Sequence, residues 1–415
     1  MNNTSKINVL GLVFFVSIIF SYIISEDTLG GAKHDFIFHE RLIVSFANDF
    51  FYTFNNYGDG DLFTRNSPIF YIILSFLFKL GIELESIRYL NLVAAPLIIY
   101  SFYQCLKIRF NNVNDIYLKI FSFIIFLSPT VRSLIIWPYP ILYAFILFLV
   151  SIKFYLKFLK DNNSKLANAL KSTLYIALSA YITPNFSVFG IFLIYKFYLE
   201  FKLSKSLNYI IALNFFLALP AIIYYYTFDF YFFKHTVYDI SNLIKFNFFN
   251  KIVIITSLLF FYFLPFLKKD SFQKIIQELL NIKKNYILYF LVLICVYAFN
   301  YPPGFGGGVF YHISSTLFSN NYLLFSVFFL SIFLFKSANL INLDNIIIFV
   351  CLILYNLQIS IYHKYFDPLI LFVYLFLLSF NKDNRKTKIK DLIKKYYCLY
   401  LIFLGMSIYK VTFLT

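Results

Sequence analysis

Repeated apolar runs of about 20 residues restrict what this chain can fold into more than any other feature. A run of that length spans the hydrocarbon core of a bilayer as a helix, because about 20 residues at 1.5 Å each cover about 30 Å. The mean hydropathy of +0.74 and the 13% content of charged residues indicate the same class. The sequence therefore predicts an all-α polytopic membrane protein, with residues 1–415 as a single integral membrane domain.

The pattern of apolar runs predicts about 13 transmembrane helices, within a range of 11 to 13. The first run, Ile7 to Ile24, has no small-residue cleavage site before Ser25, so we expect it to be retained as an anchor. The other predicted spans are 88–106, 117–129, 138–156, 172–183, 185–199, 207–227, 250–267, 286–300, 321–335, 345–362, 368–381 and 396–414.

Acidic residues gather in one long polar segment, residues 25–67, which carries a charge of −4 in a chain of +16. Cytoplasmic loops retain positive charge, so this topology places 25–87 outside; the inside loops then sum to +17 and the outside loops to −3. Within 25–87 we expect an amphipathic helix and, at 68–80, a short re-entrant or interfacial helix. The predicted buried side of the first is formed by Phe36, Phe38, Leu42, Ile43, Phe46 and Phe50.

The acidic loop also supplies the first candidate site, His34 and Asp35 with Glu26, Asp27, His39 and Glu40. A carboxylate at the outer surface can deprotonate a hydroxyl group or bind sugar hydroxyls. Asp35 is the catalytic candidate, because the preceding Gly30-Gly31 pair lets the backbone turn and the following helix fixes its position. The alternative for each residue is a solvated charge that only sets topology.

Three further outer segments carry candidate binding residues. In the hairpin SPTVRSLIIWPYP, Arg132 is the single charge, and its planar donors suit phosphate. In the turn YHKYFDP, charges lie close to hydrocarbon, which usually marks a site; the candidates there are His363, Lys364 and Asp367. The Gly-rich outer loop 300–320 adds His312. The alternatives are interfacial anchors for the first two segments and a plain turn for the loop.

The arrangement resembles the GT-C superfamily of membrane glycosyltransferases, the group with protein O-mannosyltransferases and bacterial aminoarabinose transferases. The matching segments are GGAKHDFIFHE after the first span, NSPIFYIILSFLFKLG with SIRYLNLVAAPLIIY, SPTVR, the Thr-Pro-Asn helix pair, an outer loop near 228–249 and YHKYFDP. The resemblance implies sugar transfer from a polyprenyl-phosphate donor, with Asp35 acting at the acceptor and Arg132 and Lys364 near the lipid phosphate. The family's carboxylate in the second outer loop has no counterpart here, so a divalent metal gains no clear ligand set and no cofactor is assigned.

The predicted partners are a polyprenyl-phosphate sugar donor, membrane lipids, and a glycan, lipid or protein acceptor. Nucleic acid is not expected, because Lys and Arg cluster in short loops between apolar runs. The four cysteines stand singly in apolar segments, which indicates neither a metal site nor disulfides. The predicted location is a bacterial inner membrane, with the active site on the outer face.

Two other functions compete with this interpretation. A polysaccharide polymerase or ligase is also polytopic, but we expect its large outer loop late in the chain, whereas here that loop is first and acidic. A flippase-type transporter of glycan assembly would place ionisable groups or broken helices at the midplane, usually in repeated halves. Here the charges stand at span ends.

Overall fold

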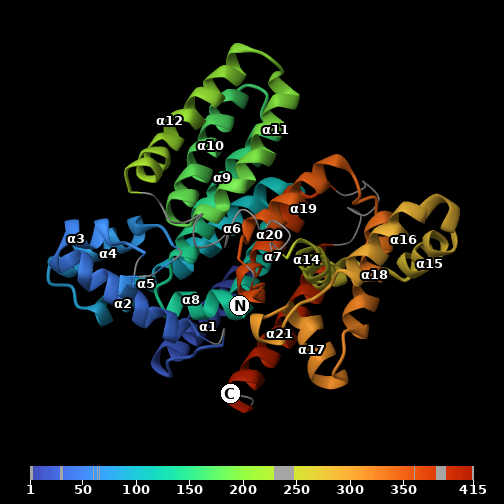
Figure 1. The fold of residues 1–415 in the computed structure, drawn as a ribbon, viewed down its shortest axis with the longest axis horizontal. Coiled ribbons are helices and arrows are strands. Elements are labelled where there is room, and N and C mark those ends of the chain that lie inside the picture. Colours follow the sequence, from blue (N-terminus) through green and yellow to red (C-terminus); the bar gives the residue numbers. More distant parts are fainter. Residues whose placement is uncertain are drawn as a thin grey trace. The chain divides into compact units, whose positions relative to one another are not determined.

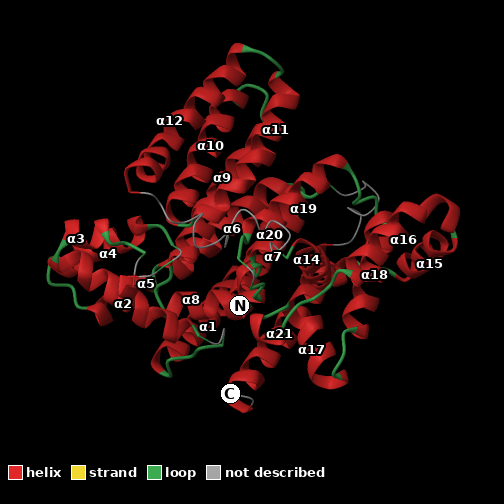
Figure 2. Cartoon of the chain, in the orientation of Figure 1, coloured by secondary structure: helices red, strands yellow, loops and turns green. Residues whose placement is uncertain are grey.

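The computed structural model of the chain is built from helices joined by loops (Figures 1 and 2). It describes residues 3–28, 31–58, 60–62, 64, 66–228, 247–358, 360–379 and 389–413. Within these ranges there is no β-strand, and the one bridge pair is the isolated Gly306–Ile361. The predicted all-helical class is confirmed.

The chain divides into two compact units, Met1–His235 with Tyr396–Thr415, and Thr236–Lys395. The α-helices of the first unit are α1 (Asn3–Ile23), α2 (Ala32–Asn48), α3 (Phe50–Asn55), α4 (Pro68–Lys79), α5 (Leu84–Asn91), α6 (Ala94–Arg109), α7 (Asp115–Ser122), α8 (Pro129–Ile136), α9 (Pro140–Lys160), α10 (Lys165–Ile182), α11 (Phe189–Phe201) and α12 (Lys205–Phe228). Its 3-10 turns are η1 (Gly60–Leu62), η2 (Phe123–Leu127) and η3 (Pro184–Val188). The last helix, α21 (Ile389–Phe413), belongs to this unit from Tyr396 onward.

The second unit surrounds one largely buried helix, α14 (Phe248–Phe263). Its other helices are α15 (Lys269–Leu280), α16 (Ile282–Tyr297), α17 (Gly308–Phe318), α18 (Tyr322–Ser337), α19 (Leu343–Tyr355), α20 (Leu369–Phe372) and the π-helical η8 (Val373–Leu377). Its 3-10 turns are η5 (Leu264–Phe266), η6 (Pro303–Phe305) and η7 (His363–Tyr365). Helices α16, α17, α18, α19 and α20 all pack against α14, whereas α15 packs on α18 and α16.

Within the described ranges, five helical segments are long and apolar enough to cross a membrane. They are Leu84–Arg109, Pro140–Lys160, Lys205–Ile223, Phe248–Phe266 and Ile389–Val411. The number rises to seven if each of two bent pairs, Asp115–Leu127 with Pro129–Ile136 and Ser271–Leu280 with Ile282–Tyr297, is one span. Helices of this length and apolar composition are typical of a helical membrane protein. The predicted total of 13 transmembrane helices stays a prediction.

The predicted topology can be checked by labelling. With the N-terminus inside and 25–87 outside, single cysteines placed at Asn56 and Asn163 of a cysteine-free protein are expected to react from opposite sides of the membrane. Asn163 is exposed in the α9–α10 connection, and Asn56 is half-buried directly after α3. A membrane-impermeant thiol reagent applied to intact and opened vesicles measures this, and labelling of both positions from one side would overturn the topology.

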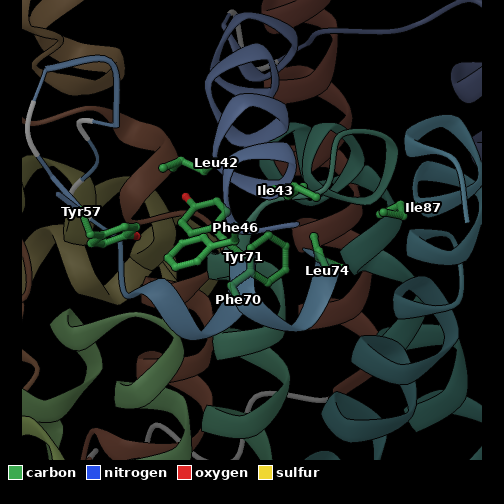
Figure 3. Close-up of a cluster of buried hydrophobic side chains, with 8 residues drawn as sticks. All are labelled: Leu42, Ile43, Phe46, Tyr57, Phe70, Tyr71, Leu74 and Ile87. Carbon is green, nitrogen blue, oxygen red and sulfur yellow. The ribbon is translucent and has the colours of Figure 1, made fainter. Parts of the chain in front are cut away.

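Helix α2 stands where the amphipathic helix was predicted, and its buried face packs on α4. Leu42, Ile43 and Phe46 surround the fully buried Tyr71 of α4, as Figure 3 shows. Two aromatic residues assigned to that face, Phe38 and Phe50, are exposed instead. Helix α4 begins as its sequence predicts, with Ser67 as the capping residue and Pro68 in the first turn.

Residues 129–136, expected to be part of a connecting hairpin, form the buried helix α8, so that expectation was wrong. The Ser128 hydroxyl accepts a hydrogen bond from the Val131 backbone N–H at 3.1 Å, and Pro129 occupies the first turn. The axis bends by 71° between the preceding helical run and α8. Arg132 therefore lies inside the first unit rather than at the tip of a loop.

Candidate functional site

The predicted site residues fall into two groups, one in each unit. His34, Asp35 and Glu40 lie on α2, and Arg132 lies on α8. The later residues stand together in the second unit, where the Gly-rich loop and the YHKYFDP turn are neighbours; they are His312, His363, Lys364 and Asp367.

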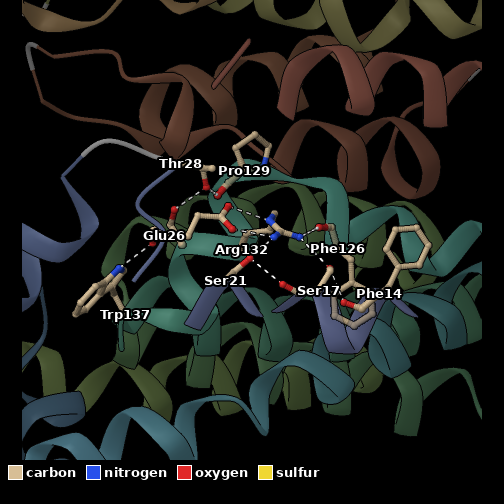
Figure 4. Close-up of polar contacts among 10 residues, drawn as sticks. Phe14, Ser17, Ser21, Glu26, Thr28, Phe126, Pro129, Arg132 and Trp137 are labelled. Atoms are coloured by element: carbon tan, nitrogen blue, oxygen red, sulfur yellow. Dashed lines mark hydrogen bonds and ion pairs between the residues drawn. The ribbon is translucent and has the colours of Figure 1, made fainter. Parts of the chain in front are cut away.

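The guanidinium group of Arg132 is buried between α1 and α8 (Figure 4). Its Nε and Nη2 donate to the two carboxylate oxygens of Glu26 at 3.0 and 2.8 Å. Nη1 donates to Ser17 Oγ at 3.2 Å and to the Phe126 carbonyl at 3.3 Å, while Nη2 also donates to Ser21 Oγ. These bonds engage all five N–H donors of the side chain.

Glu26 is the acidic partner in this buried ion pair. Burial opposes ionisation, but the hydrogen bonds and the positive charge of Arg132 outweigh it and hold the pKa of Glu26 below its ordinary value of 4.5. Trp137 Nε1 also donates to the Glu26 backbone carbonyl at 3.0 Å. Arg132 thus holds the segment after α1 against α8, and its contact with a lipid phosphate stays a prediction.

Asp27 serves the start of α2. Its carboxylate accepts from the backbone N–H groups of Gly31 at 2.9 Å and Ala32 at 3.0 Å, which would otherwise lack partners at a helix N-terminus. Beyond that turn, Asp35 and Glu40 stand five residues apart, or about 140° around the helix axis. They lie at opposite edges of the buried stripe, so the cluster predicted around Asp35 does not converge on one point.

Asp35 stands at the edge of the buried stripe of α2 that lies near His39 and Tyr71. It is half-buried, and its charge acts on the Tyr71 hydroxyl, which accepts from Asn66 Nδ2 at 3.0 Å. His39, one turn after Asp35, places its ring 5.3 Å from that of Tyr71 and its Nδ1 3.2 Å from the Pro138 carbonyl. A carbonyl only accepts, so Nδ1 carries a proton.

Glu40 stands at the other edge of α2, next to the Arg88 site, which we define as Tyr22, Glu40, Glu85, Arg88 and Trp137. Burial raises the pKa of Glu40, the charge of Arg88 opposes the rise and that of Glu85 adds to it. The third α2 candidate, His34, is exposed and places the edge of its ring on Phe38, with centroids 5.1 Å apart.

The second unit holds a polar cluster formed by Tyr262 and Asp367, which are buried, and His363, which is half-buried. The Tyr262 hydroxyl donates to Asp367 Oδ1 at 2.8 Å and lies 3.0 Å from His363 Nε2. The hydroxyl has one proton, so its bond to Asp367 makes it the acceptor for His363. Asp367 is completely buried, and a carboxyl so placed in an apolar helical unit is a functional candidate.

The Gly-rich loop and the turn are joined by backbone hydrogen bonds. Ile361 N donates to the Phe305 carbonyl at 3.1 Å, and Gly307 N donates to the Ile361 carbonyl at 2.8 Å. Gly306 has φ +95°, and a Cβ there would lie 2.9 Å from the Ile361 carbonyl oxygen, so this close approach requires glycine. Two segments that the sequence offered as separate candidates therefore form one local structure.

Lys364 and His312 complete this group. The Lys364 Nζ lies 5.5 Å from the centre of the Tyr362 ring and 6.0 Å from that of Tyr365. His312 is exposed on α17, close enough for its charge to act on His363.

Contacts along α14 show which end of this helix the 363–367 turn lies against. Asn250, in the first turn of α14, exchanges hydrogen bonds with Asn300, whereas Tyr262 contacts the 363–367 turn. Asn250 and Tyr262 are twelve residues apart on α14, which is about 18 Å along a helix axis. Residue 300 and the turn were both expected at the outer surface, but they contact opposite ends of a helix long enough to cross the membrane.

The sequence reasoning did not single out Arg88, Tyr22 or Tyr262 as site residues. Arg88 was visible as the one cation at the start of an apolar run, but Tyr22 and Tyr262 stand among many similar aromatics and carry no local signal. In the part of the chain that the structure describes, no group of three or more His, Cys, Asp or Glu residues is placed to hold a metal ion.

Comparison with known proteins gives no further guide to this arrangement. No protein-family model, curated protein or solved structure matches the chain. The case for a function therefore depends on the side chains described above.

Proposed function

We propose that the protein is a membrane glycosyltransferase that moves a sugar from a polyprenyl-phosphate donor to a glycan, lipid or protein acceptor at the outer face of the membrane. A bacterial inner membrane is the proposed setting. The proposal extends the sequence resemblance and is supported by the way the acidic residues of the first outer loop are used.

The single observation that supports it most is a division of tasks among these acids. Glu26 pairs with Arg132, Asp27 caps α2, and Asp49 caps α3 by accepting from the Tyr52 N–H at 2.9 Å. Asp35 and Glu40 stand half-buried at the two edges of α2. A carboxyl group held on a rigid helix beside hydroxyl or cationic groups is suited to proton transfer.

In the proposed reaction, an acceptor hydroxyl oxygen forms a bond to the anomeric carbon of the donor sugar. The bond from that carbon to the phosphate oxygen breaks, and the lipid phosphate leaves with the electron pair. The hydroxyl proton passes to the Asp35 carboxylate, which acts as general base. His39 and Tyr71 would position Asp35 and the acceptor.

The test is a transfer assay with the purified protein in lipid and labelled polyprenyl-phosphate sugars. Transfer of label to an acceptor that depends on Asp35 would support the proposal. Absence of transfer with every donor and acceptor class, from protein that is folded, would contradict it.

Lys364 provides a prediction for the donor. If its ammonium group contacts the lipid phosphate, Lys364→Ala should raise the apparent KM for the donor by roughly tenfold, as expected for the loss of one charge-assisted contact. The turnover at saturating donor should change little. Lys283→Ala, at an exposed position on α16, is the matched control; equal donor dependence in both variants would remove Lys364 from the site.

One observation favours a second candidate, a transporter of glycan assembly. Tyr262 and Asp367 of this cluster are buried, and Tyr262 belongs to the last turn of α14. Buried ionisable groups in membrane proteins are typical of transport pathways. Movement of a labelled lipid-linked sugar across proteoliposomes without any transfer product, abolished by Asp367→Asn, would favour transport over transfer.

A further inference from the structure

Two arginines of the first unit, Arg88 and Arg132, are buried among its described residues, and they use their donors differently. In Arg132 the edge formed by Nε and Nη2 is filled by the two carboxylate oxygens of Glu26. In Arg88 it is Nη1 that donates to both oxygens of Glu85, at 2.9 and 2.8 Å. The Nε and Nη2 of Arg88 have no hydrogen-bond partner among the described residues.

This difference matters because the Nε–Nη2 edge is the part of arginine that binds an oxyanion through two parallel hydrogen bonds. Arg88 is only 8% exposed, so its two donors are held away from solvent. Buried donors without an acceptor are rare in native proteins, because they lose hydration and gain nothing in return. The edge of Arg88 is therefore prepared for an acceptor that the described part of the chain does not supply.

Two aromatic rings hold the guanidinium group in place. Its central carbon lies 3.9 Å from the centre of the Trp137 ring and 4.9 Å from that of Tyr22. The Tyr22 hydroxyl also donates to Glu85 Oε1 at 2.6 Å, which orients the carboxylate that binds Nη1. A stacked and clamped arginine loses little freedom when it binds a ligand.

The charges nearby indicate which anion fits. Arg88 and Glu85 cancel as an ion pair, and the Lys33 ammonium group adds a positive charge 5.9 Å from the centre of the Trp137 ring. Glu40 is the second carboxyl group near Arg88, and burial raises its pKa. A singly charged ligand would balance the charge of Lys33, whereas a doubly charged one would be repelled more strongly by Glu85.

We propose that the Nε–Nη2 edge of Arg88, with Trp137 beneath it, binds a singly charged oxyanion that offers two oxygen atoms. A phosphodiester, as in a lipid-linked sugar, and the carboxylate of an acidic sugar both have this chemistry. Binding at Arg88 does not depend on the transfer reaction, so the failure of either proposal leaves the other standing.

The protein carries its own reporter for this site, because Trp137 is its single tryptophan and touches Arg88. The experiment titrates the purified protein in detergent with glucuronate, dimethyl phosphate and neutral glucose, and follows tryptophan emission. We expect a saturable change with at least one of the two anions and none with glucose. A response to glucuronate alone identifies an acidic sugar, and a response to dimethyl phosphate alone identifies a phosphodiester.

Variants localise the response. Arg88→Lys keeps the positive charge but removes the paired Nε and Nη2 donors. The apparent Kd for the anion should therefore rise by roughly tenfold to a hundredfold. Arg109→Gln, at the far end of the same helical run, should behave like the unchanged protein. Equal affinity in Arg88→Lys and the unchanged protein would overturn the proposal.

The titration of the unchanged protein can overturn the proposal without any variant. If neither anion alters its emission, the proposal is wrong. A response seen only in Glu40→Gln would show that Glu40 itself occupies the edge in the native protein, which would overturn the proposal as well.

Discussion

Replacing Arg132 with glutamine is expected to lower the free energy of unfolding by about 3–5 kcal/mol, the usual effect of removing one partner from a buried ion pair. The change leaves the Glu26 carboxylate in a site where both side chains are about nine-tenths buried. It also removes hydrogen bonds to Ser17, Ser21 and the Phe126 carbonyl. Reversible denaturation in detergent, followed by the emission of Trp137, measures the change.

A matched control and a double variant separate the ion pair from the loss of a surface charge. Arg41→Gln removes an exposed arginine of α2 and should change stability by no more than about 0.5 kcal/mol. Glu26→Gln combined with Arg132→Gln should cost clearly less than the sum of the single variants, because no charge is left unpaired. Additive losses would show that the pair does not act as a unit.

The same pair predicts how stability depends on pH. The pKa of Glu26 is lower in the folded protein than its ordinary value of 4.5, so the unfolded chain binds the proton more tightly. The stabilisation is fully present above about pH 4.5 and is lost as the pH falls through the lower folded-state value. In Glu26→Gln the free energy of unfolding should depend less on pH in this acidic range. An unchanged pH dependence would contradict the assignment of this effect to Glu26.

Asp35→Asn is expected to reduce sugar transfer by a factor of about 10² to 10⁴, the usual contribution of a general base. The substitution keeps the shape of the side chain and removes the basic oxygen. Asp35 stands in the first turn of α2, where the loss of a negative charge costs only about 0.3–1 kcal/mol, so the variant should fold and purify normally. The measurement is the rate of label transfer at saturating donor and acceptor.

The control is Asp61→Asn, at an exposed position in η1, which should retain nearly full activity. The sequence offers Asp59 as an equivalent control, but it lies outside the described residues. Glu40→Gln decides between the two edges of α2. Loss of transfer in Glu40→Gln with full activity in Asp35→Asn would move the base to the Arg88 site, and activity in both would remove α2 from catalysis.

The helices themselves could be predicted because their signals are local. Apolar runs of sufficient length gave the helical membrane class, and the spacing of Phe36, Leu42, Ile43 and Phe46 gave α2. Pro68 marked the start of α4, and Pro129 marks the start of α8 in the same way, although that signal was missed. Each of these features depends on residues within a few turns of one another.

The contents of the site depended on contacts that no local pattern encodes. Glu26 meets Arg132 across 106 positions, and Tyr262 meets Asp367 across 105. Sequence alone showed that these residues were charged or polar, but not which of them would satisfy one another. Only tertiary packing decided that Arg132 is fully engaged while Arg88 keeps two donors, because the direction of a buried side chain is set by the helices packed around it.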